Sequence, residues 1–148
     1  MRFLFVLAML PLAACTRAQI EQMHELRDKR SLGEAADAYW LAVKWNNVGG
    51  VSGFLTDGAD QLRVARMIAD GRVHYTETRL LQLVLGPELE KDRQPELREG
   101  TVLIRVEGYE NSGTRLRVQT VEQHWKRLKL KGWLVDTQKS PIDEDVPW

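Results

Sequence analysis

The sequence predicts an α+β fold in which an N-terminal helix packs on a curved, mainly antiparallel sheet of four strands. Two observations lead to this class. Apolar residues recur every three or four positions between residues 32 and 43, which is the spacing of a helix with one buried face. From residue 72 onward the apolar spacing changes to two, and turn residues separate the segments. Because neither surface is stable in water alone, the helix is expected to cover the concave side of the sheet.

The length and composition indicate one small globular domain. The chain has 148 residues, of which 43% are hydrophobic, and it carries 21 basic and 21 acidic side chains. A hydrophobic share of this size excludes a disordered chain. A formal net charge of zero supplies no global positive field for gripping phosphates, so nucleic acid is not expected as a partner.

The first fifteen residues have the pattern of an exported bacterial protein. Met1 and Arg2 precede an apolar run over residues 3–12, which at about ten residues is too short to span a bilayer of roughly 30 Å. The run ends in Leu12-Ala13-Ala14-Cys15, which resembles the lipobox of bacterial lipoproteins. The resemblance implies that residues 1–14 are a signal peptide and that Cys15 becomes the lipidated first residue. Two alternatives remain, an ordinary secretory signal with an incidental cysteine and an N-terminal core helix.

The lipobox resemblance also implies a location. Cys15 is the only cysteine, so no disulfide can form within the chain. Two or three acyl chains on that residue would anchor the protein to a lipid bilayer, at about 0.8 kcal/mol per buried methylene. Thr16 follows in place of the aspartate that retains enteric lipoproteins in the inner membrane. We therefore expect a bacterial cell-envelope protein on the periplasmic face of the outer membrane.

The main helix is expected to begin at Ser31. Ser31-Leu32-Gly33-Glu34 matches a capping box, in which the serine and glutamate side chains satisfy free backbone N–H groups. Before it, residues 15–30 are polar with a weak helical stripe and are expected to form a tether. Asn46-Asn47 and Gly49-Gly50 tolerate left-handed backbone and are expected to end the helix. Its buried face would be formed by Leu32, Ala35, Ala36, Tyr39, Trp40 and Val43.

A second helical turn, one more helix and four strands are expected to follow. The turn lies around residues 51–55, and residues 57–70 fit a helix between Asp57 and Gly71, with a hairpin as the alternative. Turn residues at 86–87, 111–113 and 131–132 join the strands into an antiparallel meander. The strands are expected over residues 73–85, 101–109, 115–129 and 133–137.

The third strand is expected to change face along its length. Leu116 and Val118 have one parity, whereas Val121 and Trp125 have the other. A bulge or strong coiling of the strand near Thr120 would reconcile the two sets.

Four motifs indicate a known type of fold. They are Ala38-Tyr39-Trp40-Leu41-Ala42-Val43, the break at Asn46-Asn47, Gln123-His124-Trp125 and Gly132-Trp133-Leu134-Val135. With them the chain resembles the nuclear-transport-factor-like, or cystatin-like, roll, and the resemblance implies a roll domain over residues 31–138. Enzymes of that family place an aspartate or histidine, often with a tyrosine, inside the cone between helix and sheet. The motifs themselves are packing motifs, so they indicate the fold and hardly the function.

The candidate ligand-binding residues are those that could line that cone. Tyr39 lies on the buried face of the helix, and alternation along the first strand puts Tyr75, Glu77 and Arg79 on one face. Glu77 and Arg79 in a pocket could bind a polar ligand. An exposed cross-strand charge pair is the simpler interpretation of these two residues.

The sequence supplies no catalytic or metal-binding set. His24, His74 and His124 stand apart, and no second His or Cys lies at ligand spacing. The glycines at 49, 50 and 53 lack the preceding strand and following lysine of a phosphate loop. We therefore assign no catalytic residue and expect neither a metal nor a cofactor.

The candidate partner-binding residues lie in the last hairpin and in the tail. Between Arg115 and Lys131 only Glu122 is acidic, so this segment could meet anionic lipid or an acidic partner, or protect an exposed strand edge. Residues 139–148 form an acidic, extended tail ending in Trp148, which could fold back on the domain or anchor a partner. The candidates are Arg115, Arg117, Lys126, Arg127 and Trp148.

These features favour a non-enzymatic, membrane-anchored lipoprotein whose domain binds an envelope protein partner or a small apolar ligand. The alternative is a small-molecule isomerase or dehydratase with a pocket in the same domain. A deep cone with His74 or Glu77 buried beside Tyr39 would favour the enzyme, and a filled core would count against it.

Overall fold

A computed structural model of the protein describes residues 10–71, 73–89, 96–110 and 115–140. Within these residues three helices precede four strands. The helices are α1 (Leu10–Lys44), α2 (Val48–Ser52) and α3 (Gly58–Asp70). The strands are β1 (Val73–Glu88), β2 (Glu96–Glu110), β3 (Leu116–Leu128) and β4 (Gly132–Val135).

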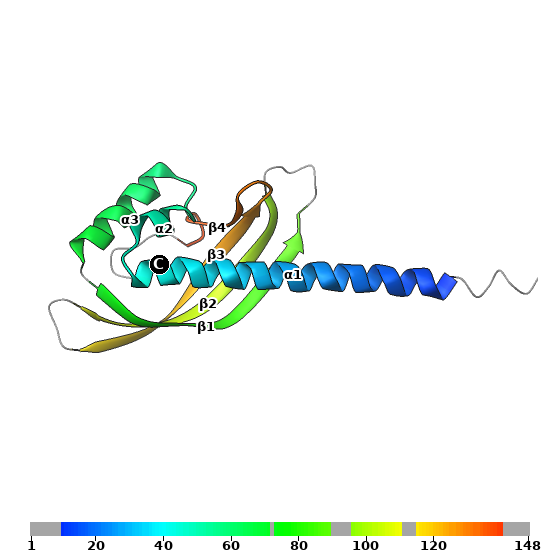
Figure 1. The fold of residues 1–148 in the computed structure, drawn as a ribbon, viewed down its shortest axis with the longest axis horizontal. Helices are drawn as coiled ribbons and strands as arrows, with labels where there is room; N and C mark the ends of the chain where they lie inside the picture. The colour runs from blue at the N-terminus through cyan, green and yellow to red at the C-terminus, as the bar shows by residue number, and fades with distance from the viewer. Residues whose placement is uncertain (1–9, 72, 90–95, 111–114, 141–148) are drawn as a thin grey trace, which may run out of the picture.

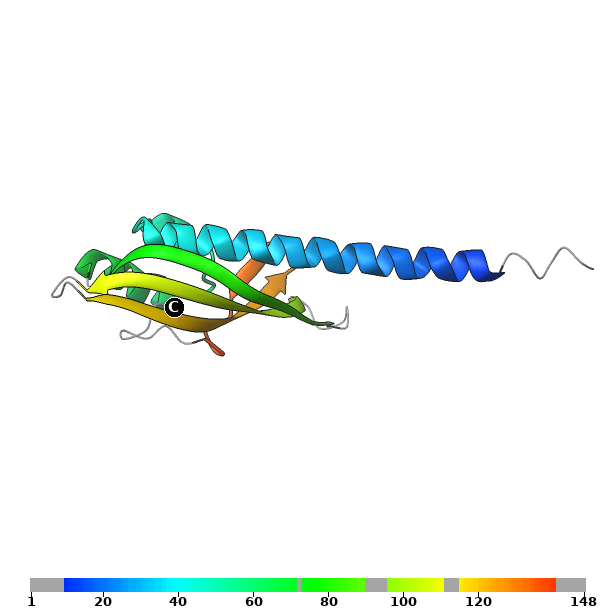
Figure 2. The same cartoon turned by 90° about the horizontal axis from the view of Figure 1, so that it is seen from below.

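The strands form one antiparallel sheet in the order β1-β2-β3-β4. The sheet curves, and α1 lies along its concave face while its N-terminal part projects beyond the sheet (Figures 1 and 2). The predicted α+β class, the helix on the sheet and the antiparallel meander of four strands are all confirmed.

The predicted helix start at Ser31 is wrong, because α1 is continuous from Leu10 to Lys44. Residues 16–30 contain neither proline nor glycine, so the polar segment continues the helix without a break. The Ser31 hydroxyl does not cap a helix end. It donates to the backbone carbonyl of Asp28, three residues earlier, at 2.9 Å, and Glu34 pairs instead with Arg30 at 2.8 Å.

The predicted helix end and the predicted helix over residues 57–70 are confirmed, whereas the turn expected around residues 51–55 begins three residues earlier, as α2. Asn46 adopts a left-handed backbone with φ 53°, and the Asn47 side chain accepts from the N–H of Gly50 to cap α2. Asp57 caps α3 by accepting from Ala59, and Gly71 ends α3 with φ 56°. Residues 57–70 are therefore the helix and not the hairpin.

The predicted bulge near Thr120 is wrong. β3 pairs with β2 without a register shift from Leu116 to Arg127, so the alternation of side chains is unbroken. Val121 and Trp125 face α1 and are buried, whereas Leu116 and Val118 lie on the outer face and are 44% and 51% exposed. The apolar residues at the start of β3 therefore form surface, and core packing does not account for them.

The bulges lie in β1 instead. Its pairing with β2 shifts between Tyr75 and Glu77, where Thr76 is the extra residue. The prediction that Tyr75, Glu77 and Arg79 share one face is therefore wrong. Tyr75 packs toward the core, while Glu77 and Arg79 are exposed on the outer face.

The core lies between the inner face of α1 and the concave face of the sheet. The predicted helical face is buried there, with Ala35 partly buried. Close packing extends to the backbone, since a Cβ at Gly100 would overlap the Leu32 side chain. The sheet contributes Val102, Ile104, Val106, Val121, Trp125, Trp133 and Val135 to this core.

Candidate functional site

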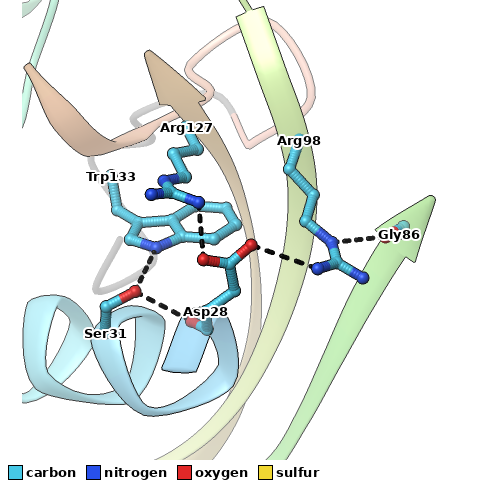
Figure 3. A network of polar contacts seen from close by, with 6 residues as sticks. All are labelled: Asp28, Ser31, Gly86, Arg98, Arg127 and Trp133. Atoms are coloured by element: carbon cyan, nitrogen blue, oxygen red, sulfur yellow. Dashed lines mark hydrogen bonds and ion pairs between the residues drawn. The ribbon is translucent and has the colours of Figure 1, made fainter. Parts of the chain in front are cut away.

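The most distinctive polar site joins α1 to every strand of the sheet, where the helix first reaches the domain (Figure 3). Arg127 of β3 donates to one carboxylate oxygen of Asp28 at 2.5 Å, and Arg98 of β2 donates to the other at 3.1 Å. Arg98 also donates to the carbonyl of Gly86 in β1 at 2.9 Å. We call Asp28, Arg98 and Arg127 the clamp.

A second hydrogen-bonded chain completes the clamp. The indole N–H of Trp133 in β4 donates to the Ser31 hydroxyl at 2.9 Å, and that hydroxyl donates to the Asp28 carbonyl. The Asp28 side chain is 6% exposed and that of Arg98 is 11% exposed. A carboxylate removed this far from water requires charged partners, and the two guanidinium groups provide them.

The part of α1 that precedes the clamp is exposed. Every side chain from Arg17 to Arg27 is exposed, and we call these residues the stalk. Ile20, Met23 and Leu26 are 53%, 68% and 62% exposed, so the weak apolar stripe lies mostly in water in the described part of the chain. Cys15 lies two residues before Arg17 in the backbone of α1, and its side chain lies outside the described part.

The space between helix and sheet is filled by aromatic rings. Tyr39 meets Trp40, Phe54 and Trp125 edge to face, with ring centroids 5.6–5.9 Å apart. Tyr75 meets Trp40 in the same way at 6.3 Å. Such edge-to-face contacts are the preferred packing of aromatic rings. We call these five residues the ring cluster.

One polar side chain from β3 is buried among the rings. The Gln123 carbonyl oxygen accepts from the indole N–H groups of both Trp40, at 3.2 Å, and Trp125, at 3.1 Å. The Gln123 amide nitrogen and the Tyr39 hydroxyl are buried without a hydrogen-bond partner among the described residues. Burial raises the pKa of Tyr39 well above its usual range, although the neighbouring Gln123 side chain, which does not reach hydrogen-bond geometry, partly lowers it. Burial also raises the pKa of Tyr75.

The predicted ligand-binding residues are not brought together. Tyr39 is fully buried and Tyr75 half-buried in the ring cluster, whereas Glu77 and Arg79 point away from it. His74 is exposed as well. Neither Glu77 nor His74 therefore lies buried beside Tyr39, which is the arrangement that the enzyme alternative required.

The predicted partner-binding residues separate into three groups. Arg115 and Arg117 are exposed at the start of β3, where Arg117 pairs with Glu110 at 2.7 Å. Lys126 is half-buried at 3.9 Å from Asp136, and Arg127 belongs to the clamp. Trp148 lies outside the described residues.

Sequence reasoning missed Asp28, Arg98 and Gln123. Asp28 stands in a polar segment with no feature that distinguishes it from its charged neighbours. Gln123 gave a usable signal, because it has the parity of Val121 and Trp125 on an amphipathic strand. A polar residue at a core-facing position usually has buried hydrogen-bond partners.

Comparison with known proteins gives no relative, since no family model, no curated protein and no solved structure matches the chain. Among the described residues, no helix combines the length and apolar character needed to cross a bilayer. The same residues contain no group of three His, Cys, Asp or Glu side chains placed to hold a metal ion.

Proposed function

We propose that the protein is a bacterial envelope lipoprotein in which a cystatin-like roll is carried on a rigid helical stalk and binds a protein partner. Cys15 would hold the lipid, on the periplasmic face of the outer membrane. The observation that carries the proposal is the continuity of α1 from the lipobox region to the clamp.

The stalk gives this anchor a defined geometry. A helix from Cys15 to Asp28 is about 20 Å long at 1.5 Å per residue, whereas a flexible tether of the same length would set no distance. The buried clamp would prevent the helix from turning against the sheet, because turning would pull Asp28 from two arginines. The domain would therefore face its partner at a fixed height and angle.

The filled interior favours a protein partner over a ligand held in the cone. The ring cluster occupies the space in which enzymes of similar fold hold their substrates. The outer face of the sheet, by contrast, leaves apolar residues in water, with Val84 49% and Tyr109 40% exposed. Exposed apolar side chains among charges are typical of protein-binding surfaces.

Metabolic labelling with palmitate tests the anchor. We expect Cys15→Ala to lose the label and to move from the membrane fraction to the soluble fraction. Met23→Ala, an exposed change on the stalk, should keep both. Thr16→Asp should keep the label and shift the protein toward the inner membrane. Labelling or membrane sedimentation of Cys15→Ala would overturn the anchor.

Photo-crosslinking in whole cells tests the partner. A photoreactive residue at Val84, on the outer face, should capture one defined envelope protein. The same residue at Glu25, on the exposed stalk, is the matched control and should not capture it. Failure to capture any protein from several outer-face positions, together with a blank ligand screen, would remove the support for a partner-binding lipoprotein.

A further inference from the structure

β3 has an edge that is only partly covered. β4 pairs with it over Trp125–Leu128, and no described strand pairs with residues 116–123 on that side. All side chains from Leu116 to Thr120 are exposed. An uncovered strand edge offers backbone groups to any extended segment, and proteins usually protect it.

The hydrogen bonds of His124 show which backbone groups of β3 point to this edge. Its carbonyl accepts from the N–H of Asp136 at 2.8 Å, and its N–H donates to the Ser140 hydroxyl at 2.7 Å. Because hydrogen-bonding direction alternates along a strand, the N–H and C=O groups of residues 116, 118, 120 and 122 also point to this edge. Their odd-numbered neighbours bond to β2.

Ser140 places the start of the tail against the uncovered edge. The hydroxyl bond ties the Ser140 side chain to the N–H of His124, whose carbonyl already accepts from Asp136 just beyond β4. Because β4 occupies the edge on one side of His124, an extended tail can follow β3 only toward Leu116. With Ser140 taken as the residue beside His124, residues 142, 144, 146 and 148 would lie opposite residues 122, 120, 118 and 116. The eight residues 141–148 are long enough, at about 3.3 Å each, to reach Leu116.

The prolines of the tail fit this register. In an edge strand, proline is tolerated only where its missing N–H would point away from the sheet. Pro141 and Pro147 are both odd-numbered. The even-numbered residues, all of which have an N–H, are those that would face β3.

The side chains fit the same register. Ile142, Val146 and Trp148 share one parity and would lie on the outer face, beside the exposed Leu116 and Val118. Asp143 and Asp145 have the other parity, which is that of Arg115 and Arg117 on β3, whereas Glu144 would lie on the outer face opposite Thr120. Trp148 would reach an open hollow of about 370 Å³, whose lining residues are Glu110, Arg115, Leu116, Arg117, Val118 and Gln119.

We infer that the tail adds a fifth strand to the sheet, antiparallel to β3 over residues 142–148, with the Trp148 indole in the hollow beside Leu116. Two independent features select the same parity, the backbone direction at His124 and the prolines, and the three apolar side chains of the tail share that parity. The inference does not depend on the lipid anchor.

A disulfide test measures the register directly. In the full chain with Cys15→Ser, no native cysteine competes. Gln119 and Asp145 would form a non-hydrogen-bonded pair with Cα atoms about 4.5 Å apart, within the range of a disulfide. We expect Gln119→Cys with Asp145→Cys to form an intramolecular disulfide under mild oxidation. Gln119→Cys with Val146→Cys, whose side chains would lie on opposite faces, should react about tenfold more slowly.

A pair of proline substitutions tests the backbone direction. Each removes one acidic side chain, so the charge change is matched. Glu144→Pro would remove an N–H that faces β3 and should slow the 119–145 crosslink by about tenfold. Asp143→Pro would remove an outward N–H and should leave the rate within about twofold.

Three outcomes would overturn the inference. Equal crosslinking at 145 and 146 would mean a tail without register. Crosslinks found only between two molecules on a non-reducing gel would make a second copy the occupant of the edge. An absence of crosslinking at both positions in a folded protein would mean that the tail does not lie on β3.

Discussion

The clamp and the ring cluster are two ways in which this small domain buries polar groups. In the clamp, both oxygens of the buried Asp28 carboxylate have charged donors, and the adjoining hydroxyl has a donor and an acceptor. In the ring cluster, Gln123 serves two indoles but leaves its own amide nitrogen and the Tyr39 hydroxyl unpartnered. The junction between stalk and sheet is therefore held by a carboxylate with charged donors on both oxygens. In the interior, the aromatic rings pack closely although two polar groups lack hydrogen bonds to the described residues.

The largest effect is expected from removing the carboxylate of the clamp. Asp28→Ala leaves two half-buried guanidinium groups facing each other without an anion, which should lower the free energy of unfolding by about 3 kcal/mol. Urea denaturation of the Cys15→Ser chain measures this loss. Asp37→Ala, an exposed aspartate on the same helix, is the matched control and should change stability by less than about 0.5 kcal/mol. Equal losses in the two variants would mean that the clamp contributes nothing specific.

A smaller effect is expected from Gln123→Met. The substitution keeps the length of the side chain but leaves the Trp40 and Trp125 indole N–H groups without their acceptor. It also removes the unpartnered amide nitrogen, so the net loss should be about 2 kcal/mol and less than that of Asp28→Ala. Gln119→Met, on an exposed position of the same strand, should be close to neutral. Near-ultraviolet circular dichroism should change only in the Gln123 variant.

The stability of the protein at alkaline pH should depend on Tyr39 in the ring cluster. Burial raises the pKa of Tyr39 in the folded protein, so above pH about 10 the unfolded chain loses a proton that the folded chain keeps, and stability must fall as pH rises. Below pH about 10 the protonated Tyr39 makes its full contribution to the free energy of unfolding. Tyr39→Phe should reduce the loss between pH 9 and pH 11 by about 1 kcal/mol. An unchanged pH dependence would contradict a tyrosine that stays protonated in the fold.

The smallest effect is expected from the same variant at neutral pH. Tyr39→Phe removes a hydroxyl that has no partner and keeps the ring contacts, so stability at pH 7 should change by less than about 0.5 kcal/mol. Thermal unfolding should show a nearly unchanged midpoint. A loss near that of Gln123→Met would mean that the hydroxyl bonds to the Gln123 amide, and the contrast between clamp and ring cluster would then be weaker.

The elements that could be predicted are those with a local signal. The buried face of α1 from Leu32 to Val43 follows from the spacing of its apolar residues, and the ends of α1 and α3 follow from Asn46 and Gly71. The errors arose where a local signal competed with its surroundings. Ser31 has a capping sequence, but the preceding residues continue the helix, and the hydroxyl serves Asp28 and Trp133 instead.

The candidate sites were less predictable for a physical reason. Asp28 contacts Arg98 and Arg127, which lie 70 and 99 residues later in the sequence. The spacing of residue types along the chain does not predict which charged side chains will pair at such separations. The faces of Tyr75, Glu77 and Arg79 depended on one extra residue at Thr76, which only the pairing with β2 fixes. Alternation predicts a face correctly only while the register is unbroken.

Apolar spacing and turn residues act over a few neighbours, so they are enough to predict the α+β class, the order of the strands and the helical face that is buried. Only the folded arrangement shows that the stalk and the core helix are one continuous helix, that Asp28 is buried between two arginines, and that Leu116 and Val118 lie on the outer face of the sheet. Each of these depends on which distant segments share a surface, and that is settled only when the sheet closes over the helix.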